Sequence, residues 1–435
     1  MKRSRVKWLM VLAAIAVLSI SACSGKDTKP AAPAAPAAAA QPAKEFTIFA
    51  RTGPDSSVWL RTVADDFTKQ TGIKVNFLEQ GQDGYFTNLT NQLVAGTDTF
   101  DLGVTNSTYV GPWAYGGYID SLDSYMANFS SDFDFNDLAF SYKIDGKAYA
   151  IPYSISAHML YYRSDLISSP PQTWDEYLAL ARKFTQSVTP SSPTKYGTAW
   201  TAKAGPEQPK CFYNYLWSLG GDIQVDGKAA VASDAGMKAG NYWAAFVKEK
   251  LIPPDGANYS YPEVLGALST GVIAMAAPYW SAAYSDITKG TSPYKDKIKV
   301  AVLPGVKKAD GSINRVSFNH SYTMVLNKKG KNKESAMKYY EFLCNKAEQL
   351  AYAKINGMPA RYSAMGDPSL DKDFFSVALE SLKITRSELL VPYYLEQHTV
   401  MNTALSGIMT NTVSVKDALN TAQSALETLY ASYKK

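Results

Sequence analysis

The chain has 435 residues, of which 12% are aromatic, and a formal net charge of +5. A chain of this length can bury the cores of two ordinary domains. Lys2, Arg3, Arg5 and Lys7 supply four positive charges, and removing these from the total of +5 leaves +1 for the rest. A nearly neutral chain without a long basic run lacks the positive surface that nucleic-acid binding requires, so nucleic acid is not an expected partner.

The first residues predict a secretory signal. A basic start precedes an apolar-to-neutral run from Trp8 to Ile20, which is shorter than the about 20 residues that a membrane-spanning helix needs. Ile20-Ser21-Ala22-Cys23 resembles the lipobox of bacterial lipoproteins, which implies cleavage before Cys23 and a diacylglyceryl thioether on its sulfur. An ordinary signal with an incidental cysteine is the alternative. We expect residues 1–22 to be a signal peptide and Cys23 to anchor the chain to the outer face of the cell membrane.

The segment after Cys23 predicts a tether. Residues 23–44 are rich in proline and alanine and contain no large apolar side chain. Such a segment cannot bury enough surface to offset the entropy of ordering, so it should be disordered or polyproline-like. No second apolar segment is long enough to span a membrane, and we therefore expect the lipid to be the only anchor. The folded part should begin near Glu45.

The chain has three cysteines. With Cys23 lipidated, only Cys211 and Cys344 remain, in unrelated sequence contexts. They could pair in an oxidising compartment, but two buried free thiols are the favoured interpretation.

The first folded elements predict a parallel sheet. Residues 46–50 alternate like a strand, Trp59, Val63 and Phe67 recur with a helical period, and residues 73–77 alternate again. Strand, helix and strand in succession form a βαβ unit. Because ligands of such sheets bind beyond the carboxyl ends of the strands, the loop Arg51–Ser56 should lie at a binding edge.

Interleaved elements continue along the chain and predict α/β domains without internal repeats. The loop Thr105–Pro112 should follow one of the strands. Helices are expected at residues 85–95, 174–184, 214–219, 234–250, 261–269, 333–344, 347–354 and 415–432, and strands at 100–104, 147–153, 159–162, 272–276, 299–303 and 322–326.

Several stretches together resemble a known family over nearly all of the mature chain. The family is extracellular solute-binding protein family 1, the sugar-binding subunits of bacterial ABC importers, which includes maltose-binding proteins. The matching stretches, in chain order, are DFTKQTGIKVNF, IDGKAYAIPYSISAHMLYYRSDL, PPQTWDEYLALARKFT, LWSLGGD, GVIAMAAPYW, KNKESAMKYYEFLCNKAEQLAY, INGMPAR and SVKDALNTAQSAL.

This resemblance implies a type II periplasmic-binding-protein fold, with two α/β lobes joined by a hinge of crossing segments. Lobe one would hold residues 45–151 and 318–366, and lobe two residues 152–317 and 367–435. The crossings would lie near 151–156, 315–320 and 367–373. The implied function is to capture a carbohydrate, expected to be an oligosaccharide, between the lobes and to deliver it to a membrane permease. The protein would act as a monomer without a cofactor.

The resemblance also implies an aromatic ligand site. Trp280 matches the position of a cleft tryptophan that stacks on a sugar ring, and a core tryptophan is the alternative. Tyr153 would face the ligand or fix the crossover. Phe212 and Tyr213 lie where the family often places another platform, and core packing is equally compatible.

Polar candidates follow the predicted strand ends and crossovers. Arg51 and Asp55 lie on the first strand-end loop, where they would bind ligand or form a structural pair. Asn106 and Ser107 end another strand and suit hydroxyl recognition. Ser156 stands where relatives often carry a charged contact, which suggests a different sugar.

The second crossover departs from the family pattern. Relatives commonly have small glycines where this chain has Phe318-Asn319-His320, so we expect an Asn319–His320 pair at the cleft mouth. A lone histidine is more often structural. Arg361, Tyr393 and Tyr394 are weaker candidates.

Catalysis and metal binding find little support in the sequence. The common hydrolase, nucleotide-binding and zinc motifs are absent, and the three histidines lack metal-ligand spacing. Residues 132–143 begin like a calcium loop, but lack its sixth-position glycine and twelfth-position glutamate. A glycosidase remains the enzyme alternative, since it also needs aromatics and two carboxylates. Binding of a non-sugar solute also stays open, whereas the continuous α/β pattern and the hinge-like segments argue against a pure adhesin or structural surface protein.

Overall fold

The computed structural model describes residues 44–52, 57–81, 83–387 and 389–433. These residues belong to one compact unit. The predicted signal peptide and tether, with Cys23, lie outside the described residues, and so does Asp55. None of the described helices is long and apolar enough to cross a bilayer.

The predicted βαβ unit at the start of the fold is confirmed. Strand β1 (Glu45–Arg51) pairs in parallel with β2 (Lys74–Gln80) and with β3 (Leu102–Asn106). Helix α1 (Ser57–Thr71) connects β1 to β2, and α2 (Tyr85–Val94) connects β2 to β3. The carboxyl ends of β1 and β3 therefore lie at the same edge of the sheet.

Two long strands continue this sheet. Its strand order is β2-β1-β3-β15-β7-β11-β8. Three short strands pair outside this order, β4 and β16 with β15, and β12 with β7. Strand β15 (Ser317–Asn327) is antiparallel both to β3 and to β7 (Pro152–Arg163). The second half of β7 pairs with β11 (Ile273–Trp280). The paired strands β15 and β7 thus connect the group of strands β1–β3 to β11.

The remaining strands are short. They are β4 (Ile119–Asp120), β5 (Tyr142–Ile144), β6 (Lys147–Ala150), β8 (Tyr196–Ala199), β9 (Gln224–Val225), β10 (Lys228–Ala229), β12 (Ile298–Ala301), β13 (Val306–Lys307), β14 (Ile313–Asn314) and β16 (Thr385–Arg386).

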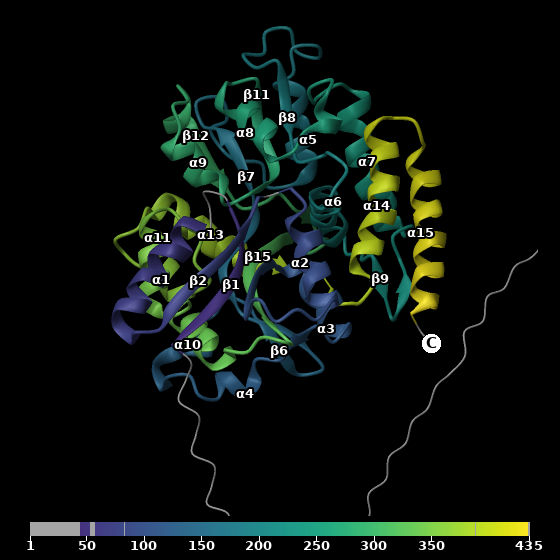
Figure 1. Cartoon of the computed structure of the whole chain (residues 1–435). Coiled ribbons are helices and arrows are strands. Elements are labelled where there is room, and N and C mark those ends of the chain that lie inside the picture. The colour runs from purple at the N-terminus through teal and green to yellow at the C-terminus, as the bar shows by residue number, and fades with distance from the viewer. Residues whose placement is uncertain (1–43, 53–56, 82, 388, 434–435) are drawn as a thin grey trace, which may run out of the picture. The chain divides into compact units, whose positions relative to one another are not determined.

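Helices surround the strands. They include α3 (Ser107–Tyr115), α4 (Asp123–Met126), α5 (Trp174–Lys183), α6 (Glu207–Ser218), α7 (Asp234–Lys248), α8 (Tyr261–Ser269), α9 (Ala283–Lys289), α10 (Lys333–Leu343), α11 (Lys346–Lys354), α12 (Tyr362–Met365), α13 (Lys372–Lys383), α14 (Tyr394–Met409) and α15 (Val415–Ser432). In Figure 1, α14 and α15 (yellow) lie side by side and next to α7.

Several element predictions were wrong. The helix expected at 214–219 is only the second half of α6, and the strand expected at 147–153 is divided between β6 and the start of β7. The expected loop Thr105–Pro112 is mostly helix α3, because the Asn106 side chain accepts a hydrogen bond from the Thr108 N–H and caps its first turn. The expected separate strand Met159–Tyr162 belongs to the continuous β7, whose residues are buried on both faces. A strand that is covered on both faces shows no polar alternation that would mark its ends.

The apolar cores join residues from distant parts of the chain. One cluster contains Phe46 of β1 together with Leu343 of α10. Another contains Trp243 of α7 together with Leu426 of α15. Cys211 and Cys344 are buried free thiols, which confirms the favoured interpretation.

Candidate functional site

Five rings from three neighbouring strands form what we call the ring cluster. Alternate residues of a strand point to one face, and β15 thereby contributes Phe318, His320 and Tyr322. His158 of β7 stands opposite Trp280 of β11, with ring centroids 3.8 Å apart. The His320 centroid lies 5.6 Å from that of Trp280 and 5.8 Å from that of Tyr322. The cluster therefore runs continuously across the central strands.

An ion pair from the first turn of α6 is joined to this cluster. The Trp280 indole Nε1 donates to Glu207 Oε2 at 2.6 Å, and Lys210 Nζ donates to Glu207 Oε1 at 3.2 Å. Lys210 Nζ also lies 3.3 Å from His320 Nδ1. Because an ammonium group can only donate, this contact requires His320 Nδ1 to be the acceptor.

Burial and neighbouring charges act in opposite directions on Glu207. Burial alone would raise the pKa of its carboxyl group, but the Lys210 ammonium, the two nearby histidines and the Trp280 N–H together hold the pKa below the ordinary value of 4.5. The carboxylate is therefore ionised at neutral pH. Lys210 is only 1% exposed, so the site carries a buried cation matched by a carboxylate that is partly open to solvent.

His158 packs against Trp280 as a neutral imidazole. Burial lowers the pKa of His158 to about 3. Its Nδ1 accepts from Asn214 Nδ2 at 2.9 Å, and Asn214 Oδ1 accepts from the Phe318 N–H at 2.7 Å. The proton of the imidazole is therefore on Nε2, which has no hydrogen-bond partner among the described residues.

The strand ends of the β1–β3 group meet the same cluster. Arg51, the last residue of β1, donates to the Tyr322 hydroxyl at 2.6 Å and lies over its ring at 4.8 Å. Ser107, the first residue of α3, places its Oγ 3.2 Å from His320 Nδ1. The structure thus brings together Arg51, Ser107, Trp280 and His320 of the predicted site residues. Asn106 lies beside Ser107, but its amide oxygen caps α3.

The second crossover does not form the expected Asn–His pair. Adjacent residues of a strand point to opposite faces, so Asn319 lies on the face of β15 away from His320. Both amide atoms of Asn319 are buried without a partner among the described residues. Ser156 pairs with His320 across the strands, and its Oγ lies 2.8 Å from Ser281 Oγ.

Three other predicted residues lie within cores. Phe212 packs edge-on against Trp243. Tyr213 packs against both Trp217 and Phe318, which also stack directly on each other. Tyr153 packs against Trp59 in the cluster that holds β1 and α1.

Arg361 has a structural place. It is fully buried, and its guanidinium donates to the carbonyl oxygens of Cys344, Phe133 and Asp134 and to the Asp137 carboxylate. These bonds attach the segment before α12 both to the end of α10 and to residues 133–137.

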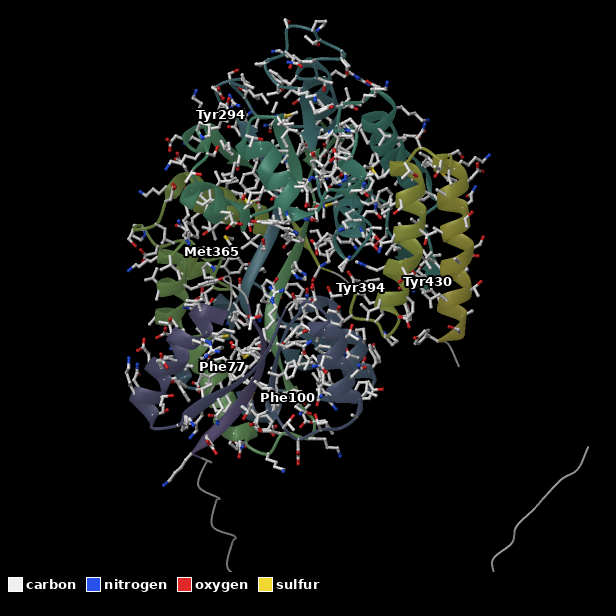
Figure 2. The ribbon with its side chains drawn as sticks, turned by 45° about the horizontal axis from the view of Figure 1, so that its top comes forward. Phe77, Phe100, Tyr294, Met365, Tyr394 and Tyr430 are labelled. Atoms are coloured by element: carbon white, nitrogen blue, oxygen red, sulfur yellow. The ribbon has the colours of Figure 1, made fainter. Side chains whose placement is uncertain are left out.

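The weaker candidates lie at the start of α14. Tyr394 is labelled in Figure 2. Its ring packs on His398 with centroids 4.3 Å apart. The Tyr393 hydroxyl accepts from Gln224 Nε2 at 2.8 Å.

Sequence reasoning missed Glu207, Lys210, His158 and Tyr322 as site residues. The helix was expected to begin only at residue 214, so the i, i+3 spacing of Glu207 and Lys210 carried no signal. Two acidic residues of the calcium-like segment form ion pairs, Asp134 with Lys346 and Asp137 with Arg361.

Two surface depressions lie away from the ring cluster. One of about 670 Å³ is lined by residues including Trp217, Asp222 and Arg386, and a second of about 370 Å³ includes Asp120 and Lys328. Neither is lined by a ring of the cluster or by its ion pair. The convergence of polar and aromatic groups, rather than depression size, therefore identifies the candidate site.

Comparison with known proteins agrees with this architecture. Residues 62–374 match a family model described as "Bacterial extracellular solute-binding protein". A binding protein of Brucella abortus (strain 2308) is 27% identical over 318 residues, which cover 71% of this chain and 72% of that protein.

Solved structures share the fold. Maltose-bound MalE3 of T. maritima has a TM-score of 0.74 and 22% identity, covering 88% of this chain and 99% of that one. An ABC transporter solute-binding protein from Agrobacterium radiobacter K84 in complex with ribitol has a TM-score of 0.77 and 22% identity, covering 88% and 98%. These similarities confirm the predicted two-lobed α/β binding-protein fold.

Proposed function

Because this chain belongs to the bacterial extracellular solute-binding proteins, we propose that it captures an uncharged carbohydrate or polyol and delivers it to the membrane permease of an ABC importer. The observation that carries this proposal is the Trp280 indole, fixed between Glu207 and His158. Similar structures that hold maltose and ribitol support it.

The chemistry of the site suits a polyhydroxyl ligand. A sugar presents apolar C–H faces, which pack on aromatic rings, and hydroxyl groups, which both donate and accept hydrogen bonds. Trp280 supplies the ring, and Glu207 supplies carboxylate lone pairs beyond its two protein contacts. Because the Lys210 charge is already matched by Glu207, a neutral ligand adds no unpaired charge to the site.

The division into two lobes keeps its expected bounds as part of the proposal: residues 45–151 with 318–366, and 152–317 with 367–435. The cluster that joins β1 to α10 and the cluster that joins α7 to α15 support this division. Closure of hinged lobes on a ligand couples occupancy to recognition by the permease.

Export and anchoring complete the proposed role. A signal peptide at residues 1–22 and lipid on Cys23 would keep the monomeric protein beside its permease at high effective concentration. Metabolic labelling with a radioactive fatty acid should mark the wild-type chain and not Cys23→Ala. Labelling of both proteins, or of neither, would contradict the anchor.

The proposal also states that the protein does not alter its ligand. Glu207 is the one carboxylate attached to the ring cluster among the described residues, whereas a glycosidase needs two. Chromatography after long incubation should recover the bound sugar unchanged. A hydrolysis product would favour the glycosidase alternative.

A thermal-shift panel tests the ligand class. Ligand binding stabilises the folded state by RT ln(1 + [L]/Kd), so at least one sugar or polyol should raise the melting temperature, and amino acids should not. Trp280→Ala should abolish the shift. Trp59→Ala is the matched control, because Trp59 is similarly buried in the lobe-one core and its loss should lower stability without removing the shift. If no sugar or polyol raises the melting temperature, the proposal is wrong.

A further inference from the structure

Two large side chains of β15, Phe318 and His320, pack beside the Trp280 indole. We infer that Phe318 and His320 restrict the ligand to a single sugar ring or a short linear polyol. This inference rests on the proposed function and departs from the expected oligosaccharide. Three observations support it: the cover over Trp280, the bridge that His320 makes, and the fixed position of Phe318.

The indole of Trp280 is mostly covered by protein rings. His158 lies at a centroid distance of 3.8 Å, His320 at 5.6 Å and Phe318 at 6.3 Å. Trp280 is consequently only 7% exposed. The part of the indole that remains for stacking is therefore limited on the side of β15, where Phe318 and His320 lie.

His320 bridges the space between two helix starts. Its Nδ1 lies 3.2 Å from Ser107 Oγ of α3 and 3.3 Å from Lys210 Nζ of α6. The imidazole therefore stands between the β1–β3 group and the α6 side. A chain of sugar rings that passes between these helices must displace the imidazole and break its contact with the buried ammonium group.

Packing and a backbone hydrogen bond fix the rotamer of Phe318. Its ring stacks on Trp217 at 5.6 Å with an interplanar angle of 6°, and Tyr213 lies at 6.2 Å. The Asn214 side-chain oxygen accepts a hydrogen bond from the Phe318 backbone N–H. The outer face of Trp217 is covered by the Arg386 guanidinium at 4.4 Å. Phe318 thus forms a packed wall, and packed interiors deform little to admit extra volume.

Specificity of this kind arises from steric exclusion of the longer competitor. A site closed by side chains discriminates by ligand length, because each additional ring must either clash or remain outside the cleft. The discrimination should therefore be reversible by removing the blocking side chain.

Calorimetric titration with ribitol, mannitol, glucose, maltose and maltotriose tests the inference on the mature full-length chain. The wild type should bind a one-ring or linear probe at least about tenfold tighter than maltotriose, which corresponds to one decade in Kd. His320→Ala should reduce this ratio by about tenfold or more, with tighter maltose or maltotriose binding.

A milder variant and a control separate size restriction from general damage. Phe318→Leu should shift the preference in the same direction. Phe375→Leu, at an equally buried phenylalanine in α13, should leave the preference unchanged while lowering stability. A wild type that prefers maltotriose, or a His320→Ala protein with an unchanged ratio, would overturn the inference and leave the proposed carbohydrate function standing. Failure of every probe to bind would refute both.

Discussion

Replacing Lys210 by methionine retains most of the volume of this buried side chain and removes its charge. In the wild type its ammonium donates to Glu207 and contacts His320. Removing one member of a buried ion pair costs about 3–5 kcal/mol, because the other charge stays uncompensated. The Glu207 side chain is 34% exposed, and solvent screening lowers the expected cost to about 2–3 kcal/mol.

Urea denaturation at neutral pH measures this cost, and the double variant Glu207→Gln with Lys210→Met tests its cause. If the uncompensated carboxylate is responsible, the double variant should be more stable than Lys210→Met alone by about 1–2 kcal/mol. Equal stability of the two variants would refute the reasoning, and so would a cost below about 0.5 kcal/mol.

The same pair predicts a pH dependence. Burial alone would raise the pKa of Glu207, and Lys210 is the largest of the contributions that nevertheless hold it below 4.5. A depressed pKa stabilises the folded state above pH 4.5, and this stability is lost as the pH falls through the folded-state value. In Lys210→Met the pKa should rise, so the difference in stability between wild type and variant should shrink at acid pH. A constant difference across pH would contradict this assignment.

Three further predictions concern the scaffold. Arg361→Met should cost about 3–5 kcal/mol in urea denaturation, because four acceptors, two of them in fully buried contacts, lose their donor, and Arg361→Lys should restore only part of it. Gly197→Ala should destabilise by about 1–3 kcal/mol, since its Cβ would lie 2.2 Å from a backbone oxygen, whereas Gly266→Ala in α8 meets open space and should stabilise by about 0.5–1 kcal/mol. In a Cys23→Ala chain, Cys211 and Cys344 should resist thiol reagents until the protein unfolds, because burial raises the pKa of both thiols, that of Cys211 to about 12; labelling of the native protein would refute their burial.

The sequence predicted the fold well where local pattern and global packing agree. The strand at β1 and the stripe of α1 follow from periodicity alone. The break expected within β7 was wrong. This strand is buried on both faces, and its nearly continuous apolar sequence fits a buried strand or a buried helix segment equally well. The helix α3 was missed because its cap acts through one asparagine side chain, and Pro112 suggested a loop.

The site could be predicted only in part. Trp280 and His320 were found through a family resemblance, and the structure places both in one cluster. Glu207 and Lys210 depend on where α6 begins, which the apolar pattern did not show. Asn319 was misplaced because two adjacent residues were treated as a pair, although a strand directs them to opposite faces.

The core that unites β1 with α10 bears on how the chain folds. Phe46 and Leu343 lie far apart in sequence and share one apolar cluster, so the core around β1 cannot be completed until α10 has been synthesised. Folds that depend on such distant contacts form slowly, because the entropy of loop closure is lost before the contacts that stabilise the fold can form. A chain built this way stays open for longer after synthesis, which would give an export machinery time to thread it across the membrane before it folds.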